Sequence, residues 1–234
     1  MLRFHPQLLD AYLRDDPILP LLTEAAEPVD AGFASHRWLL DSPAKRLIYH
    51  AAYGDLLRPV ARRLRLLDVG GGYCALTRLL VTHHDYTLVD LMVHDRHADL
   101  RAVEASLGGH FWTNADWYTA PPGEPYDVIL ANDLFPNVDQ RLALFLETHL
   151  PRCAEMRLVL TYYPQPRFYH VKRLDGDEHL WMLAWDAQQV HRVLSAVADR
   201  IHELNWEALH RPDPSLFPNQ RQVCLVRLRG NRHA

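Results

Sequence analysis

The 234-residue chain is poor in lysine, in paired cysteines and in long apolar stretches. Lysine occurs only at Lys45 and Lys172, so a mechanism that needs a lysine must use one of these two positions. The three cysteines, Cys74, Cys153 and Cys224, show no CxxC spacing, which argues against a disulfide framework and against a cysteine-ligated zinc site. We therefore expect a reducing, cytoplasmic compartment.

Two further deficits limit the partners of the protein. No run of about 18 apolar residues is present, and the first residues lack the apolar core of a signal peptide, so we expect neither a membrane partner nor export. Basic residues number 25 against 29 acidic ones, a net charge of −4, which argues against a nucleic-acid partner. The content of 48% hydrophobic and 23% charged residues is typical of a globular protein of one or two domains.

The apolar pattern changes its period near Arg65. Before that residue helical spacing dominates, and Ser42-Pro43 predicts the N-cap and first turn of a helix that continues to Leu56. After it, short apolar runs alternate with amphipathic segments, which is the pattern of βαβ units around a parallel sheet. We therefore predict a helical N-terminal cap over residues 1–62 and an α/β domain over residues 63–234.

The predicted elements of the second segment follow one another in regular order. Strands are expected over 66–69, 86–90, 110–112, 127–131 and 157–161, and helices over 75–81, 96–107, 139–150 and 187–199. Two last apolar runs, 201–209 and 222–228, are separated by prolines with no helix between them, so we expect them to pair as an antiparallel hairpin. The predicted fold class is α/β, a doubly wound and mostly parallel sheet.

A glycine turn lies directly between the first strand and the first helix of this domain, in Asp68-Val69-Gly70-Gly71-Gly72. Glycine suits a turn that needs unusual backbone angles and that a ligand must approach without meeting a Cβ atom. Eighteen residues after Gly72, Asp90 ends the next strand, where its carboxylate can accept hydrogen bonds from both hydroxyls of a ribose. Together these residues predict a nucleoside-containing cofactor.

The choice of cofactor depends on Asp68. Gly70, Gly72 and Ala75 also satisfy the fingerprint of NAD-binding folds. A carboxylate two residues before the first glycine would repel a pyrophosphate, whereas S-adenosylmethionine has no phosphate and carries an ammonium and a sulfonium. We therefore expect S-adenosylmethionine, with an NAD-dependent oxidoreductase as an alternative.

Together with Leu66-Leu67 and Asp90, the glycine turn resembles motifs I and II of the class I S-adenosylmethionine-dependent methyltransferases. The Gly-Gly-Gly-Tyr turn and the Tyr86–Leu91 strand are similar to those of the small-molecule or sugar O-methyltransferases. The resemblance covers Arg65 to the C-terminus. It implies a seven-stranded sheet of order 3-2-1-4-5-7-6 with strand 7 antiparallel. The family often has a third glycine where this chain has Cys74.

The resemblance also assigns further cofactor-binding positions. Asn114–Trp117 resembles the segment whose acid binds the adenine amino group, which implies that role for Asp116 with Trp117 beside it. Residues 127–133 resemble motif IV and add Asn132. The full set expected to bind the cofactor is Asp68, Gly70, Gly71, Gly72, Asp90, Leu91, Asp116, Trp117 and Asn132.

The acceptor is expected beyond the carboxyl ends of the strands, where open α/β sheets bind their ligands. In the loop after the fourth strand Asp133 is a candidate base or orienting group; the other interpretation is that Asn132 and Asp133 cap the next helix. Residues 162–184 are rich in aromatic and titratable groups, and Asp175-Gly176-Asp177 is a good turn sequence, so we expect a hairpin or lid there. The candidate catalytic residues are Asp133, His170 and Tyr162, with His149 as a further candidate base.

The expected reaction is direct SN2 transfer of a methyl group to an oxygen or nitrogen of a small-molecule acceptor, with alignment as the main contribution of the protein. The alternatives are cyclisation or aminocarboxypropyl transfer with the same cofactor, and a non-catalytic binding subunit. No metal is expected, because His83-His84 and His94-x-x-His97 are interpreted as solvated surface in a chain with 15 histidines. The oligomeric state stays open, with a homodimer among the options.

Overall fold

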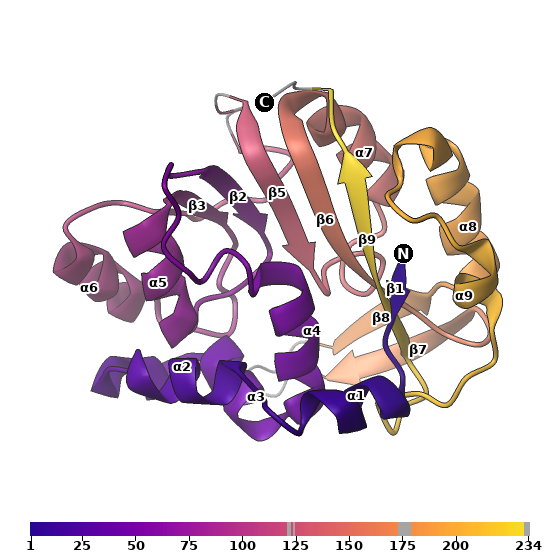
Figure 1. Cartoon of the computed structure of the whole chain (residues 1–234), viewed down its shortest axis with the longest axis horizontal. Coiled ribbons are helices and arrows are strands. Elements are labelled where there is room, and N and C mark those ends of the chain that lie inside the picture. Colours follow the sequence, from indigo (N-terminus) through magenta and orange to yellow (C-terminus); the bar gives the residue numbers. More distant parts are fainter. Residues whose placement is uncertain (121–122, 124, 173–178, 232–234) are drawn as a thin grey trace.

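A computed structural model describes the chain except for residues 121–122, 124, 173–178 and 232–234. A twisted sheet forms its centre, with helices on both faces (Figure 1). Within the described residues, seven strands pair in the order β1-β9-β6-β5-β2-β3-β4, and β7 and β8 form a separate two-stranded sheet. No helix of this part of the chain has the length and apolar content that a bilayer crossing needs.

The strands and helices alternate along the second half of the fold, after a helical N-terminal segment. The strands are β1 (Leu2–Arg3), β2 (Arg65–Val69), β3 (Asp85–Val89), β4 (Trp112–Thr113), β5 (Tyr126–Asn132), β6 (Cys153–Tyr162), β7 (Arg167–Lys172), β8 (His179–Ala184) and β9 (Gln222–Arg229). The helices are α1 (Pro6–Tyr12), α2 (Ile18–Glu24), α3 (Ala34–Asp41), α4 (Pro43–Tyr53), α5 (Ala75–His83), α6 (His97–Leu107), α7 (Leu142–His149), α8 (Ala187–Ser195) and α9 (Trp206–His210). Short 3₁₀ turns are η1 (Pro28–Gly32), η2 (Leu150–Arg152) and η3 (Ala198–Arg200).

The pairing of the strands confirms the predicted fold class. β4, β3, β2, β5 and β6 run parallel to one another, and β9 lies between β6 and β1 and is antiparallel to both. In the numbering of the prediction this is the order 3-2-1-4-5-7-6 with strand 7 antiparallel, and β1 takes the place of strand 6.

The predicted hairpin between 201–209 and 222–228 is wrong, although its second arm is β9. The first arm meets the sheet only at its first two residues, through an isolated antiparallel bridge between Ile201 and Leu228 and a hydrogen bond from the N–H of His202 to the backbone oxygen of Arg227 at 2.9 Å. The segment Trp206–His210 forms the helix α9 instead of a strand. The edge of the sheet is therefore completed by the N-terminal strand β1.

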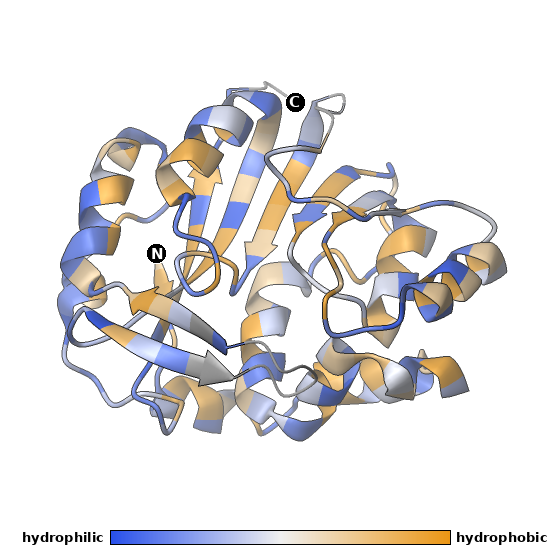
Figure 2. Cartoon of the chain, turned by 180° about the vertical axis from the view of Figure 1, so that it is seen from behind, coloured by the Kyte–Doolittle hydropathy of each residue, from blue (hydrophilic) through white to orange (hydrophobic). Residues whose placement is uncertain are grey.

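Alternating side chains of the strands build one apolar core on each face of the sheet, as the period of two requires. On one face, Leu66 and Leu88 pack in a core with residues of α2, α4 and α5. On the other face, Ile129 and Leu158 pack with residues of α7 and α8. In Figure 2 the strands of the large sheet are mostly orange, and the flanking helices carry orange on one side and blue on the other.

The N-terminal helices lie across the carboxyl ends of the parallel strands (Figure 1). Ser42 caps α4, because its side chain accepts a hydrogen bond from the backbone N–H of Lys45 at 3.3 Å. The helix ends at Tyr53, earlier than the predicted Leu56. Arg157 of β6 donates to the backbone oxygen of Ala52 at 2.7 Å, which ties α4 to the centre of the sheet.

A hairpin of β7 and β8 follows β6, within the segment for which a hairpin or lid was expected. The two strands pair antiparallel from Arg167 opposite Ala184 to Lys172 opposite His179. The predicted turn at 175–177 lies outside the described residues. Figure 1 shows the hairpin at the same end of the sheet as the N-terminal helices, so both border the region beyond the strand ends.

Candidate active site

A cavity of about 1010 Å³ opens at the carboxyl ends of the parallel strands. One part of its lining comes from the glycine turn after β2, the loop after β3, the segment after β4 and residues 139–141, which contact that segment. Another part comes from α4, residues 132–138 after β5, the hairpin and the start of β9. After the roles that the sequence predicts for them, we refer to the first part as the nucleoside half and to the second as the acceptor half. This is the edge of an open α/β sheet at which ligands bind.

The glycine turn can be built only from glycine at two of its positions. Gly70 and Gly72 have φ of +67° and +65°, in the left-handed region that residues with a Cβ atom rarely adopt. A Cβ atom at Gly72 would also collide with Oγ of Ser35, and one at Gly70 would meet Leu134 Cδ1 at 3.1 Å. The backbone of the turn is therefore packed tightly on one side and lines the cavity on the other.

Asp90 is held at the wall of the nucleoside half by two backbone groups. Its Oδ2 accepts a hydrogen bond from the N–H of Gly72 at 2.9 Å, and its Oδ1 accepts one from the N–H of Met92 at 2.7 Å. Burial raises the pKa of this carboxyl, and the two N–H groups oppose the rise. Each oxygen keeps a further lone pair, so the carboxylate can still accept from a pair of ligand hydroxyls. Leu91, predicted beside the cofactor, also lines this half.

Asp68 lies beneath the glycine turn and not in the lining of the cavity. Its carboxylate is 2% exposed and accepts hydrogen bonds from the hydroxyls of Tyr53, at 3.0 Å, and Tyr86, at 2.8 Å. Burial raises its pKa to about 7. A Cβ atom at Gly71 would collide with the same carboxylate, so Asp68 supports the turn from below. Asp68 was expected beside the cofactor, and the sequence does not indicate its two tyrosine partners.

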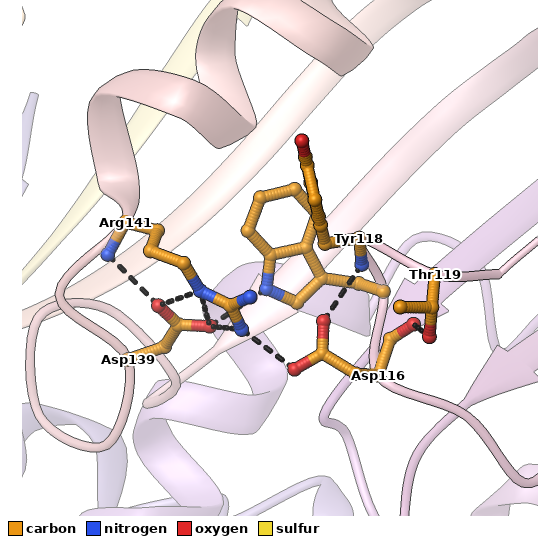
Figure 3. Close-up of polar contacts among 6 residues, drawn as sticks. Asp116, Tyr118, Thr119, Asp139 and Arg141 are labelled. Atoms are coloured by element: carbon orange, nitrogen blue, oxygen red, sulfur yellow. Dashed lines mark hydrogen bonds and ion pairs between the residues drawn. The ribbon is translucent and has the colours of Figure 1, made fainter.

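At the far end of the nucleoside half, Arg141 joins two carboxylates (Figure 3). Its Nη2 donates to Asp116 at 2.6 Å and to Asp139 at 2.5 Å. Asp116 also accepts from the backbone N–H of Tyr118 at 2.8 Å, and Asp139 accepts from the indole N–H of Trp117 at 2.7 Å. The predicted pair Asp116 and Trp117 therefore lines the cavity, in a network with two partners that the sequence did not indicate.

Asp133 is the candidate catalytic residue that lies at the cavity. It follows β5 with φ of +60° and accepts hydrogen bonds from Thr161, from Asn137 Nδ2 at 3.3 Å and from Arg221 Nη1 at 2.8 Å. The alternative that Asn132 and Asp133 cap the next helix is wrong, because α7 begins at Leu142. Three donors instead fix the direction of the Asp133 carboxylate.

The structure places three more polar side chains in the acceptor half, and the sequence did not assign them to it. Lys45 comes from α4, Tyr169 from the hairpin and Arg221 from the residue before β9. The hydroxyl of Tyr169 donates to Asn137 Oδ1 at 3.3 Å. Of the three, Lys45 had a signal in the sequence, since it is one of two lysines.

The other candidate catalytic residues lie away from the cavity. Tyr162 is 2% exposed in the core, and its hydroxyl has no hydrogen-bond partner among the described residues. His170 is exposed on the outer side of the hairpin, with Nε2 at 2.9 Å from Nδ1 of His179. His149 is buried against Trp117, and burial lowers its pKa to about 4.

The histidine pairs are not all on the surface. The interpretation as solvated surface is wrong for His84, which is 1% exposed and has Nε2 at 2.8 Å from the backbone oxygen of Leu56. His94 lines the edge of the cavity beside Trp38, and Nε2 of His97 lies 3.1 Å from the backbone oxygen of Leu91. Among the described residues, no three His, Cys, Asp or Glu side chains gather as ligands of one metal ion.

Neither the known family models nor the curated proteins include a match to this chain. Solved structures match its fold. The N-terminal domain of EvdMO1 with S-adenosylhomocysteine bound has a TM-score of 0.53 at 18% identity, over 92% of this chain and 96% of that one. The N-methyltransferase NodS from Bradyrhizobium japonicum WM9, in complex with S-adenosylhomocysteine, has a TM-score of 0.51 at 14% identity, over 93% and 100%. The DhpI complex with S-adenosylhomocysteine has a TM-score of 0.50 at 17% identity, over 96% of both chains. The chain therefore has the fold of the class I S-adenosylmethionine-dependent methyltransferases.

Proposed function

We propose that this protein is an S-adenosylmethionine-dependent methyltransferase that acts on an oxygen or nitrogen of a small-molecule acceptor. The observation that carries the proposal is the position of Asp90, which two backbone N–H groups hold at the wall of a cavity beside the glycine turn. Three proteins of this fold are described with S-adenosylhomocysteine bound. The cavity also extends to a second, polar half in which an acceptor can lie.

The sheet favours this cofactor over NAD. Dinucleotide-binding folds have a parallel sheet of order 3-2-1-4-5-6. Here the antiparallel strand β9 lies between β6 and the edge strand β1.

In this proposal the residues of the nucleoside half hold the cofactor. Asp90 binds the ribose hydroxyls, Asp116 the adenine amino group, and the backbone of Gly70–Gly72 faces the methionine end. When bound, S-adenosylmethionine supplies a methyl group on a positively charged sulfur, which the acceptor attacks by SN2 displacement. Residues 63–234, together with the edge strand β1, form the cofactor-binding domain, and the helical segment that ends at residue 62 caps the active site.

The protein contributes chiefly orientation and exclusion of water. Asp133 can accept a hydrogen bond from the acceptor hydroxyl or amine and direct its lone pair, because Arg221 and Thr161 already fix the carboxylate. The N-terminal helices and the hairpin border the same space, which suits a small acceptor better than a polymer. We place the enzyme in the cytoplasm, where its free, buried cysteines stay reduced.

The proposal is tested by isothermal titration with S-adenosylhomocysteine. Asp90→Ala removes the acceptor of two ribose hydrogen bonds and is expected to weaken binding at least about tenfold. Asp85→Ala is the matched control, because Asp85 lies on the same strand β3, at its other end, and is exposed. Equal affinity of Asp90→Ala and wild type would place the ribose elsewhere, and no binding by the wild type would refute the proposal.

The product of turnover separates methyl transfer from other reactions of the same cofactor. Methyl transfer releases S-adenosylhomocysteine, whereas cyclisation and aminocarboxypropyl transfer release methylthioadenosine. Chromatography of the reaction mixture distinguishes the two thioethers. Recovery of methylthioadenosine would replace the methyltransferase by one of these alternatives.

A further inference from the structure

The acceptor half of the cavity contains two cations close to a single carboxylate. Arg221 forms an ion pair with Asp133 at 2.8 Å. Lys45 lines the same half and is influenced electrostatically by both of these residues. No carboxylate of the described residues forms an ion pair with the Lys45 ammonium. The group of three therefore carries a net charge of +1, from two cations and one anion.

The ammonium of Lys45 is half-buried and rests on an aromatic ring. Its Nζ lies 4.3 Å from the centroid of the Trp38 ring. Burial lowers the pKa of Lys45, Asp133 raises it and Arg221 lowers it further. A cation that is partly removed from water is stabilised by an anion beside it. An anionic ligand would supply that partner.

Arg221 is fixed in place with donors to spare. Its side chain is 12% exposed, and its Cζ lies 3.8 Å from the centroid of the Phe217 ring. Its Nη1 donates to Asp133, and a guanidinium has five N–H donors in all. The remaining donors can bind a second acidic group without loss of the Asp133 pair.

We propose that the methyl acceptor is an acidic small molecule whose carboxylate or phosphate group binds between Lys45 and Arg221. This inference rests on the proposed methyltransferase function and names its substrate class. Lys45 belongs to α4 and Arg221 directly precedes β9, whereas the nucleoside half is lined mainly by the segments that follow β2, β3 and β4. Asp133, beside Arg221, then orients the hydroxyl or amine of the same molecule.

The carboxylate of the cofactor is the other anion that could reach Lys45, and a first titration separates the two sources. S-adenosylhomocysteine is titrated into the wild type and into Lys45→Gln. We expect the two dissociation constants to agree within about twofold. A tenfold loss in Lys45→Gln would assign the cation to the cofactor and overturn the inference. Failure of the wild type to bind would refute the methyltransferase function itself.

A second titration uses matched probes on the protein saturated with S-adenosylhomocysteine. The pairs are 4-hydroxybenzoate with 4-hydroxybenzamide, and phenyl phosphate with phenol. We expect at least one acid to bind more tightly than its neutral partner, and Lys45→Gln to weaken that acid by roughly 10- to 100-fold. The neutral partners should not respond to the substitution.

Two variants control for folding and for overall charge. Lys45→Arg keeps the positive charge and is expected to retain most of the affinity for the acid. Arg58→Gln removes an exposed cation outside the cavity lining and is expected to leave both titrations unchanged. The inference is overturned if neither acid exceeds its neutral partner, or if Arg58→Gln weakens the acid as much as Lys45→Gln does.

Discussion

Asp68 should make the stability of the ligand-free protein fall as the pH rises. Its carboxyl is 2% exposed, and the two groups that donate to it are the neutral hydroxyls of Tyr53 and Tyr86. Burial therefore raises its pKa from the ordinary 3.8 to about 7. The substitution Asp68→Asn keeps the shape and a hydrogen-bonding group at this position and removes the titration.

The direction of this pH dependence follows from the number of protons that the folded and unfolded chains bind. Between about pH 4 and pH 7 the folded chain keeps a proton on Asp68 that the unfolded chain releases. Stability from this group is complete below pH 3.8 and is lost as the pH rises through the folded pKa of about 7. Between pH 5 and pH 8 the full slope applies only up to the folded pKa, that is, over about two pH units. At about 1.4 kcal/mol per pH unit, the loss in the free energy of unfolding is about 3 kcal/mol. For a chain of this size that corresponds to roughly 6–12 °C in Tm.

Thermal unfolding of wild type and Asp68→Asn at pH 5, 6, 7 and 8, without ligand, measures this difference. The wild type should lose several degrees of Tm relative to the variant as the pH rises. Groups such as His149, whose pKa burial lowers to about 4, titrate in both proteins and cancel in the comparison. Asp85→Asn, at the exposed end of β3, should follow the wild type. Parallel pH profiles for wild type and Asp68→Asn would show that Asp68 does not bind a proton on folding.

Two further predictions concern the attachment of the N-terminal helices. Ser42→Ala removes the N-cap of α4 and should cost about 1 kcal/mol, or roughly 2–4 °C in Tm, and an unchanged Tm would contradict the cap. Arg157→Leu removes a 3% exposed guanidinium that binds Asp55, Glu155 and the backbone of Ala52, and should lower the free energy of unfolding in urea by about 2 kcal/mol, because the two carboxylates left behind stay in contact with water. A change below 1 kcal/mol would show that these contacts do not hold α4 on the sheet.

The nucleoside half of the cavity could be predicted because the residues that indicate it lie close together in the sequence. The glycine turn and Asp90 are separated by one helix and one strand, and parallel pairing of β2 and β3 brings their ends together. The contact between Gly72 N–H and Asp90 follows from that arrangement. The central strands were predicted for the same reason, since each is an apolar run of ordinary length.

The acceptor half could not be predicted, because it depends on which face each strand presents. β7 carries aromatic residues on both faces, and the structure turns Tyr169 to the cavity and His170 to the outside. A shift of one residue would exchange them. Lys45 and Arg221 are 176 residues apart in the chain, which leaves no spacing motif to find.

The edge strand β1 could not be predicted from its local sequence either. β1 has two residues and pairs with β9 through Leu2 and Arg3. The guanidinium of Arg3 donates to Gln222 at 2.7 Å and to the backbone oxygen of Ala208 at 3.2 Å, so this strand is held by contacts distant in sequence. The predicted strand over 201–209 does not form, because the side chain of Asn205 accepts a hydrogen bond from the N–H of Ala208 at 3.0 Å and caps the helix α9.

A pair of titrations on the wild type identifies the cofactor that the glycine turn and Asp90 bind. Isothermal titration with S-adenosylhomocysteine and, separately, with NAD measures saturable binding to the cavity beside Asp90. We expect saturable binding of S-adenosylhomocysteine at one site per chain and no response to NAD. Saturable binding of NAD without a response to S-adenosylhomocysteine would contradict it.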